Sequence, residues 1–286
     1  MKDKEPLHFV GRRGVTIVGE SFGPDDGWPV LFLHGGGQTR HAWRRVAERV
    51  AADGWRAVTV DLRGHGESDW ANDGDYSFDS FRADCEVVAT SLGQPVLVGA
   101  SLGGKAALLC AGEDPTSVSG LVLVDITHKV NPVGKDRILS FMNGAMGGFD
   151  TLEEASDAIA SYTPHRERRR DLEGLTKVLR HRDGRWYWHW DPVTVRVIPA
   201  EEETEDYVTS FHRAMSRIAV PTMLVRGSLS DVVSDDGVAD LVARIPGTTV
   251  VTVPDATHMI AGDRNDAFGD AIVSFLRDQV STGEQG

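Results

Sequence analysis

The sequence predicts an α/β fold, with a mostly parallel sheet of eight strands, flanking helices and an inserted helical cap. Two observations support this prediction. Short apolar runs alternate with helical patterns along most of the 286 residues. Between Ile126 and Ile218 this alternation stops and helical patterns replace it. A chain of this length also buries a substantial core without disulfides or metals.

The predicted strands are short runs rich in apolar and β-branched residues. They are Leu7–Val10, Val15–Val18, Val30–Leu33, Arg56–Val60, Pro95–Val98, Leu121–Val124, Thr222–Val225 and Thr248–Val253. We expect the first two to form an antiparallel hairpin. The helices predicted between the strands are His41–Ala52, Phe78–Leu92, Leu102–Gly112, Asp235–Arg244 and Asp266–Val280.

The interrupted segment divides the chain into core residues 1–126, a cap at 127–218 and core residues 219–286. Within the cap, apolar residues at helical spacing predict helices at Asp136–Ala145, Leu152–Ser161, Asp171–Leu179 and Glu205–Ile218. The run from Trp186 to Pro192 has alternating aromatics and predicts a short extended segment. We expect the cap to lie over the carboxyl ends of the strands, where open α/β sheets bind ligands.

Composition narrows the range of functions. The formal net charge of −13 argues against general affinity for nucleic acids. The two cysteines, Cys85 and Cys110, fall in helical patterns and are expected to be reduced thiols. We see no Cys/His spacing typical of a metal site, no leader and no membrane-length apolar run. We therefore expect a cytoplasmic protein without metal or cofactor that acts on a small molecule; its oligomeric state is open.

Residues 99–103 read Gly-Ala-Ser-Leu-Gly, between a predicted strand and a predicted helix. In this context the turn is tight, and it projects Ser101 from the carboxyl end of the sheet above the start of a helix. Small residues at Gly99 and Gly103 allow the neighbouring elements to approach. The pattern predicts that Ser101 is a nucleophile.

A serine hydroxyl needs a general base, and that base needs a carboxylate to orient it. Asp231 follows the predicted strand at Thr222–Val225, and His258 follows the strand that ends at Val253. Both therefore lie at the same sheet edge as Ser101. We predict that His258 is the base and that Asp231 orients it, while Asp255 forms a turn.

At this point the chain resembles the α/β-hydrolase family, in particular its lidded esterase, C–C hydrolase and cofactor-free haloperoxidase-like branch. The motifs that carry the resemblance are Leu33-His34-Gly35-Gly36-Gly37, Asp61-Leu62-Arg63-Gly64-His65-Gly66-Glu67-Ser68, Gly99–Gly104, Arg226–Val233 and Asp255–His258. Together they are specific for the fold and the catalytic triad, and they say little about the substrate.

The resemblance implies further roles. His34 and His65 are expected to make structural hydrogen bonds. Asp125, at the end of the strand Leu121–Val124, is the alternative to Asp231, because some relatives use that position. The expected oxyanion hole comprises the backbone N–H groups of Leu102 and Gly36.

Aromatic residues and methionines of the cap are candidates for an apolar substrate pocket, although packing of cap against core also explains them. The candidates are Phe141, Met142, Met146, Trp186 and Trp188.

The sequence favours a serine hydrolase that cleaves a medium-sized, largely apolar carboxylic ester or lactone through an acyl-enzyme on Ser101. Two alternatives keep the triad: a C–C hydrolase of the meta-cleavage type, for whose acidic substrates the basic segment 164–185 is suited, and a haloperoxidase or perhydrolase. A third, from another class, is a receptor-like binder of small molecules with incidental turnover.

Overall fold

The computed structural model describes residues 5–162, 172–202, 204–258 and 265–280. These residues contain an eight-stranded sheet in the order β1-β2-β4-β3-β5-β6-β9-β10. β1 and β2 form an antiparallel hairpin, β2 is also antiparallel to β4, and the pairs from β4 to β10 are parallel. The strands are β1 (Leu7–Val10), β2 (Thr16–Phe22), β3 (Pro29–Leu33), β4 (Arg56–Val60), β5 (Val96–Ala100), β6 (Gly120–Val124), β9 (Thr222–Gly227) and β10 (Thr249–Val253).

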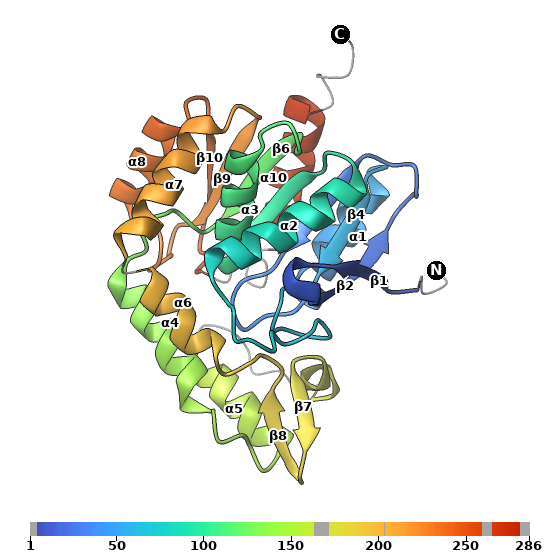
Figure 1. Cartoon of the computed structure of the whole chain (residues 1–286), viewed down its shortest axis with the longest axis vertical. Coiled ribbons are helices and arrows are strands. Elements are labelled where there is room, and N and C mark those ends of the chain that lie inside the picture. The colour runs from blue at the N-terminus through green and yellow to red at the C-terminus, as the bar shows by residue number, and fades with distance from the viewer. Residues whose placement is uncertain (1–4, 163–171, 203, 259–264, 281–286) are drawn as a thin grey trace.

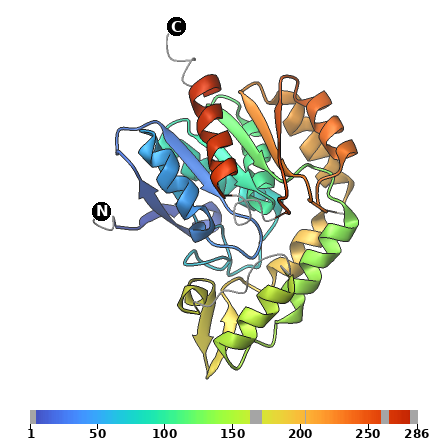
Figure 2. The same ribbon diagram turned by 180° about the vertical axis from the view of Figure 1, so that it is seen from behind.

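Helices cover both faces of the sheet, as the two opposite views show (Figures 1 and 2). One face carries α2 (Phe78–Leu92), α3 (Leu102–Glu113), α7 (Glu205–Arg217) and α8 (Asp235–Arg244). The other carries the 3-10 turn η2 (Arg40–Trp43), α1 (Arg44–Ala52), α10 (Asn265–Phe275) and the π-helical turn η4 (Leu276–Val280). Each face buries its own apolar cluster, because β3, β4, β5 and β6 are buried on both sides.

The predicted fold class is confirmed, and each of the eight predicted strands is present within a few residues. The β-branched runs predict the central strands β3, β5, β6 and β9 well, because these strands are buried on both faces and consist largely of apolar residues. The helices Phe78–Leu92 and Asp235–Arg244 have the predicted bounds. Ser77 caps the first by accepting a hydrogen bond from the Ser80 N–H, and Ser234 caps the second through the Gly237 N–H.

The segment between β6 and β9 leaves the core and forms a cap at one end of the sheet, below it in Figure 1. Its elements are α4 (Pro132–Gly144), α5 (Leu152–Tyr162), the 3-10 turn η3 (Glu173–Lys177), β7 (Leu179–Arg182), β8 (Arg185–Trp188) and α6 (Thr194–Glu201). The aromatic run is extended as predicted, since β8 pairs with β7 in a hairpin. The cap therefore contains a two-stranded hairpin besides its helices. The predicted helix at Asp171–Leu179 is replaced by η3 and the start of β7, and its first residue lies outside the described ranges.

Helix α7, which we expected in the cap, packs against the core. Its residues Phe211, Ala214 and Met215 are buried in the same apolar cluster as α2 and α3. A Cβ at Gly112 of α3 would lie 2.5 Å from Ala214, so the two helices are in direct backbone contact. The apolar periodicity of α7 predicts the helix itself, but periodicity does not indicate which neighbouring element its apolar face will contact.

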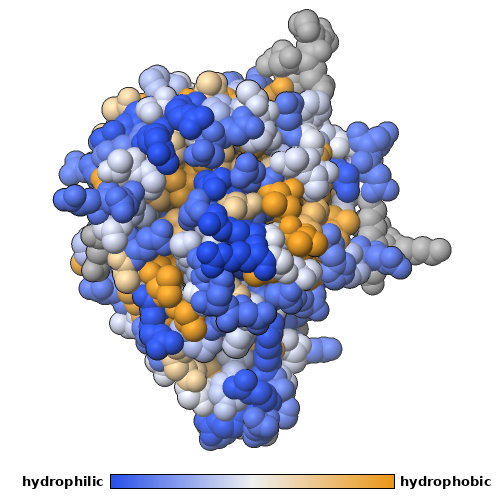
Figure 3. Space-filling view, in the orientation of Figure 1, coloured by the Kyte–Doolittle hydropathy of each residue, from blue (hydrophilic) through white to orange (hydrophobic). Residues whose placement is uncertain are grey.

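The exposed surface is mainly hydrophilic on the face of Figure 3, where hydrophobic side chains gather in several separate patches. Large exposed apolar side chains, such as Val10, Val133 and Leu229, belong to different elements. Within the described residues, the helices are too short or too polar to cross a membrane.

Candidate active site

Ser101 occupies the turn between β5 and α3, with a φ of 47° and a ψ of −115°. A residue with a side chain is strained in this region, and such strain is found where surrounding structure enforces it. Here β5 and α3 enforce it from either side. The predicted strand, turn and helix around Ser101 are thus present.

The glycines flanking Ser101 are required by close approach. A Cβ on Gly99 would lie 2.5 Å from the Gly103 carbonyl oxygen, and a Cβ on Gly103 would lie 2.4 Å from that of Leu33. Any larger residue at either position would push α3 away from β5 or β3. The elbow therefore depends on small residues in the way that the sequence predicted.

His258 follows β10, and its Nδ1 lies 2.8 Å from Oδ2 of Asp125. The Asp125 side chain is 1 % exposed and that of His258 is 8 % exposed. Asp125 follows β6, the neighbour of β5, and Ala100 is in register with Val124. Ser101 and Asp125 therefore leave adjacent strands at the same level of the sheet edge.

The Asp125 carboxylate is held by two donors besides His258. The Gly227 N–H donates to Oδ1 at 2.9 Å, and the Ser230 hydroxyl donates to Oδ2 at 2.5 Å. The loop after β9 therefore supplies hydrogen-bond donors to the acid. With Nδ1 bonded to a carboxylate, the His258 ring has its proton on Nδ1 and its lone pair on Nε2.

The prediction that Asp231 orients His258 is wrong. The Asp231 side chain turns toward α4, where its Oδ1 accepts a hydrogen bond from Arg137 at 2.9 Å. This loop is anchored to the chain that leads into the cap, since the Asn131 N–H donates to the Val232 carbonyl. Asp231 and Arg137 are 33 % and 40 % exposed, which is typical of a surface ion pair. Asp125, the alternative named from the sequence, has the position next to His258.

Ser101 and His258 line the same cavity. No hydrogen bond joins the two side chains among the described residues. Catalytic hydrogen bonds are often long in unliganded enzymes and tighten when substrate binds.

The predicted oxyanion donors lie beside Ser101. Leu102 is the first residue of α3, and the Gly35–Gly37 loop follows β3; these residues also line the cavity. A Cβ on Gly36 would lie 4.0 Å from the Leu102 side chain, so the two predicted donor residues are neighbours. Among the described residues, the backbone N–H groups of Gly36 and Leu102 have no acceptor. The Gly37 N–H, by contrast, donates to His65 Nε2 at 3.2 Å.

Three buried histidines connect this loop, the loop after β4 and the cap. His34 Nε2 accepts the Leu62 N–H at 3.0 Å, and His65 Nε2 accepts the Gly37 N–H. His189, from the cap, accepts the Gly66 N–H at 2.7 Å. Burial lowers the pKa of His34 to about 4 and that of His65 to about 3, so both rings are neutral at pH 7 and free to accept. The structural roles implied for His34 and His65 are present.

The cavity has a volume of about 1020 Å³ and lies between the sheet edge and the cap. Of the five predicted pocket residues, Phe141, Met142 and Trp188 line it. The other two predictions are wrong. Met146 is 37 % exposed, and Trp186 packs on His181 with a ring-centroid distance of 4.7 Å.

Sequence reasoning missed two features of this cavity. Trp190 stacks on Trp188 with centroids 4.8 Å apart, and a Cβ on Gly37 would meet it at 3.4 Å. Lys105, one turn after Ser101 on α3, is buried and forms an ion pair with Glu202. Its ammonium lies 5.3 Å from the ring centroid of Phe78. Lys105 lies four residues after Ser101, and this spacing places the two residues on the same side of α3. The sequence therefore contained a signal for Lys105, but no pattern indicated Glu202 as its partner.

Comparison with known proteins agrees with the fold. The model of the alpha/beta hydrolase fold family matches residues 29–264. The esterase Rv0045c of Mycobacterium tuberculosis is 32 % identical over 224 residues, which cover 74 % of this chain and 70 % of the esterase. The non-heme chloroperoxidase CPO-A1 of Kitasatospora aureofaciens is 26 % identical, with 93 % and 97 % of the two chains covered. The solved structure of E-2-(acetamidomethylene)succinate hydrolase has the same fold, with a TM-score of 0.83, 22 % identity, and coverage of 96 % and 99 %.

Proposed function

Because the chain belongs to the α/β-hydrolase family, we propose that it is a serine hydrolase that cleaves a medium-sized, largely apolar carboxylic ester or lactone. One observation carries the proposal: Ser101 and His258, the latter held by Asp125, line one wall of a cavity of about 1020 Å³. The cap side of this cavity includes Ile138, Leu139, Phe141, Met142 and Trp188. Such a lining suits an apolar acyl or alcohol group.

In the proposed reaction Ser101 Oγ attacks the carbonyl carbon while His258 Nε2 takes the hydroxyl proton. Asp125 keeps the imidazole oriented and stabilises its charged form. The N–H groups of Gly36 and Leu102 stabilise the oxyanion. The C–O bond to the alcohol breaks, and His258 donates its proton to the leaving oxygen. Water, deprotonated by His258, then hydrolyses the acyl-enzyme, which returns the proton to Ser101.

The test is hydrolysis of p-nitrophenyl esters of graded acyl length by the wild type and by Ser101→Ala. We expect kcat/KM to fall by at least about 10³-fold in the variant. Ser91→Ala is the matched control, because Ser91 lies near the end of α2 and its hydroxyl donates to the Val88 carbonyl of the same helix. A fluorophosphonate should label the wild type at Ser101. Equal turnover by Ser101→Ala would refute the proposal.

A second candidate reaction uses the same residues. The near full-length similarity to a chloroperoxidase favours perhydrolysis, in which peroxide replaces water as the acceptor of the acyl group. Peroxide-dependent halogenation in acetate buffer that exceeds ester hydrolysis would favour this reaction. Rapid loss of a coloured dienol diketone, with little ester turnover, would favour C–C hydrolysis. Saturable ligand binding without any turnover would favour a binding protein.

A further inference from the structure

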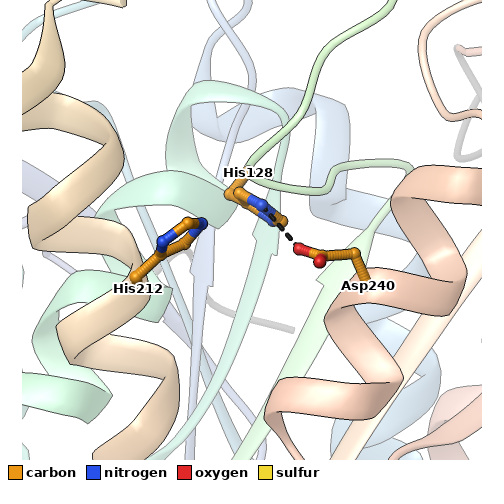
Figure 4. Close-up of side chains that lie close together, drawn as sticks. All are labelled: His128, His212 and Asp240. Atoms are coloured by element: carbon orange, nitrogen blue, oxygen red, sulfur yellow. Dashed lines mark ion pairs between the residues drawn. The ribbon is translucent and has the colours of Figure 1, made fainter.

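Figure 4 shows a cluster of three ligand-type side chains, none of which lines the cavity. His128 belongs to the loop after β6, His212 to α7 and Asp240 to α8. One potential ligand atom from each lies within 4.8 Å of the others. His128 Nε2 is 2.9 Å from an Asp240 carboxylate oxygen, and the two imidazole rings are 5.2 Å apart, edge to face.

Three imidazole nitrogens in this cluster are buried and lack hydrogen-bond partners within the described ranges. Among the described residues, neither nitrogen of His128 nor Nε2 of His212 has one. The approach of His128 to Asp240 is close but lacks hydrogen-bond alignment, and the His128 side chain is only 2 % exposed. Buried polar atoms are satisfied in most folded proteins, so several orphaned nitrogens that face one another require an explanation.

We propose that His128, His212 and Asp240 form a binding site for a divalent transition-metal ion, for which zinc is the best fit. Two imidazoles and one carboxylate are the ligand types that zinc takes, while calcium and magnesium prefer oxygen ligands alone. Three protein ligands leave a fourth tetrahedral position to water. Burial also lowers the pKa of both histidines, and the neutral ring is the form that binds metal.

Zinc must compete with two basic side chains, Arg244 and Lys129, for the Asp240 carboxylate. Asp240 also accepts from Arg244 Nε at 2.9 Å and lies 3.6 Å from Lys129 Nζ. Lys129 is 57 % exposed and Arg244 is 34 % exposed, so both reach water when they release the carboxylate. The three ligand atoms must also adjust, because zinc–ligand bonds of about 2.0–2.1 Å place tetrahedral ligands about 3.4 Å apart. The contact of 2.9 Å between His128 and Asp240 would widen, while the atoms that are up to 4.8 Å apart would approach.

The site joins the two ends of the cap to the core. His128 follows Asp125 by three residues on the segment that leaves the core, and α7 is the helix by which the chain returns. Bound zinc would link both segments to α8 and so stabilise the folded state. This inference does not depend on the proposed reaction.

The test is calorimetric titration of the chelator-treated full-length protein with zinc chloride. We expect one equivalent to bind the wild type and to raise its Tm. His212→Gln and Asp240→Asn should each weaken binding by at least about 100-fold, because loss of groups that merely orient metal ligands already costs about 10–100-fold. Circular dichroism and the Tm without zinc establish that these variants fold.

Two further variants separate this site from others. His8→Gln removes an exposed histidine on β1 and should leave binding unchanged. His258→Gln removes the active-site imidazole and should also bind one equivalent. Absorption of bound cobalt in the visible range should report tetrahedral coordination in the wild type and be lost in His212→Gln. No binding by the wild type, unchanged binding by His212→Gln, or loss confined to His258→Gln would overturn the proposal.

Discussion

At the scale of single residues, Asp125 and Asp231 offer two carboxylates of which one contacts His258. Asp125→Asn replaces the acceptor of the Nδ1 proton by an amide, which favours the wrong tautomer of the imidazole. We expect kcat for ester hydrolysis to fall about 10³–10⁴-fold, the size of effect seen when a triad aspartate is changed to asparagine.

Asp231→Asn is the matched variant for this prediction. It disrupts only a half-exposed pair with Arg137, so kcat should change by less than about threefold. Steady-state kinetics on one p-nitrophenyl ester measure both variants. A larger loss in Asp231→Asn than in Asp125→Asn would restore the assignment made from the sequence.

The difference between these two aspartates shows what motifs reveal and what they omit. Ser101 and His258 are marked by their immediate neighbours, because an elbow and a short loop after a strand are local features. Asp125 and Asp231 both follow strands, so local sequence fits either. The choice depends on Arg137 and Ser230, which draw one carboxylate away and hold the other in place. Those contacts depend on how the cap is attached to the core, and the spacing of residues along the sequence does not predict that attachment.

At the scale of elements, contact between α3 and α7 depends on Gly112. Its added Cβ would lie 2.5 Å from both the backbone and the Cβ of Ala214, which a rigid helix pair does not accommodate easily. We expect Gly112→Ala to lower the free energy of unfolding by about 1–3 kcal/mol, as overpacking does. Urea denaturation followed by circular dichroism measures it.

Gly144→Ala is the control for the same substitution. Gly144 is the last residue of α4, and an added Cβ meets nothing within 4 Å. Alanine in a helix is favoured over glycine, so this variant should be neutral or more stable by up to about 1 kcal/mol. Equal destabilisation by both variants would mean that α3 and α7 are not in close contact.

The elements also differ in how far the sequence predicts them. The central strands β3, β5 and β6 carry largely apolar runs, and all eight core strands lie close to their predicted bounds. In the cap, β7 reads Leu-Arg-His-Arg, and only Leu179 is apolar and buried, so its residues contain no alternating apolar pattern. Its pairing with β8 comes from the intervening turn at Asp183 and Gly184, both with positive φ. Short exposed hairpins of this kind are poorly marked by periodicity.

At the scale of the whole molecule, buried histidines connect distant segments. His34 bonds the loop after β3 to that after β4, and His189 bonds the cap to the same region through the Gly66 N–H. Each accepts a backbone hydrogen only while its ring is neutral. The attachment of cap to core is therefore tied to the protonation of these side chains.

The stability of the protein should consequently fall on mild acidification. Burial lowers the pKa of His34 from 6.5 to about 4 in the folded state, so between these values the unfolded chain binds a proton that the folded chain does not. The contribution of neutral His34 to the free energy of unfolding is fully present above pH 6.5. It is lost as the pH falls toward 4, and for His34 alone the loss is about 3 kcal/mol. Carboxylates such as Asp75, with a pKa of about 2, change the stability mainly below this pH range.

Urea unfolding at intervals from pH 7.5 to 4 measures how steeply the free energy of unfolding depends on pH. His34→Gln keeps an acceptor for the Leu62 N–H but does not titrate, so its slope should be shallower; an equal slope would contradict the assignment to His34.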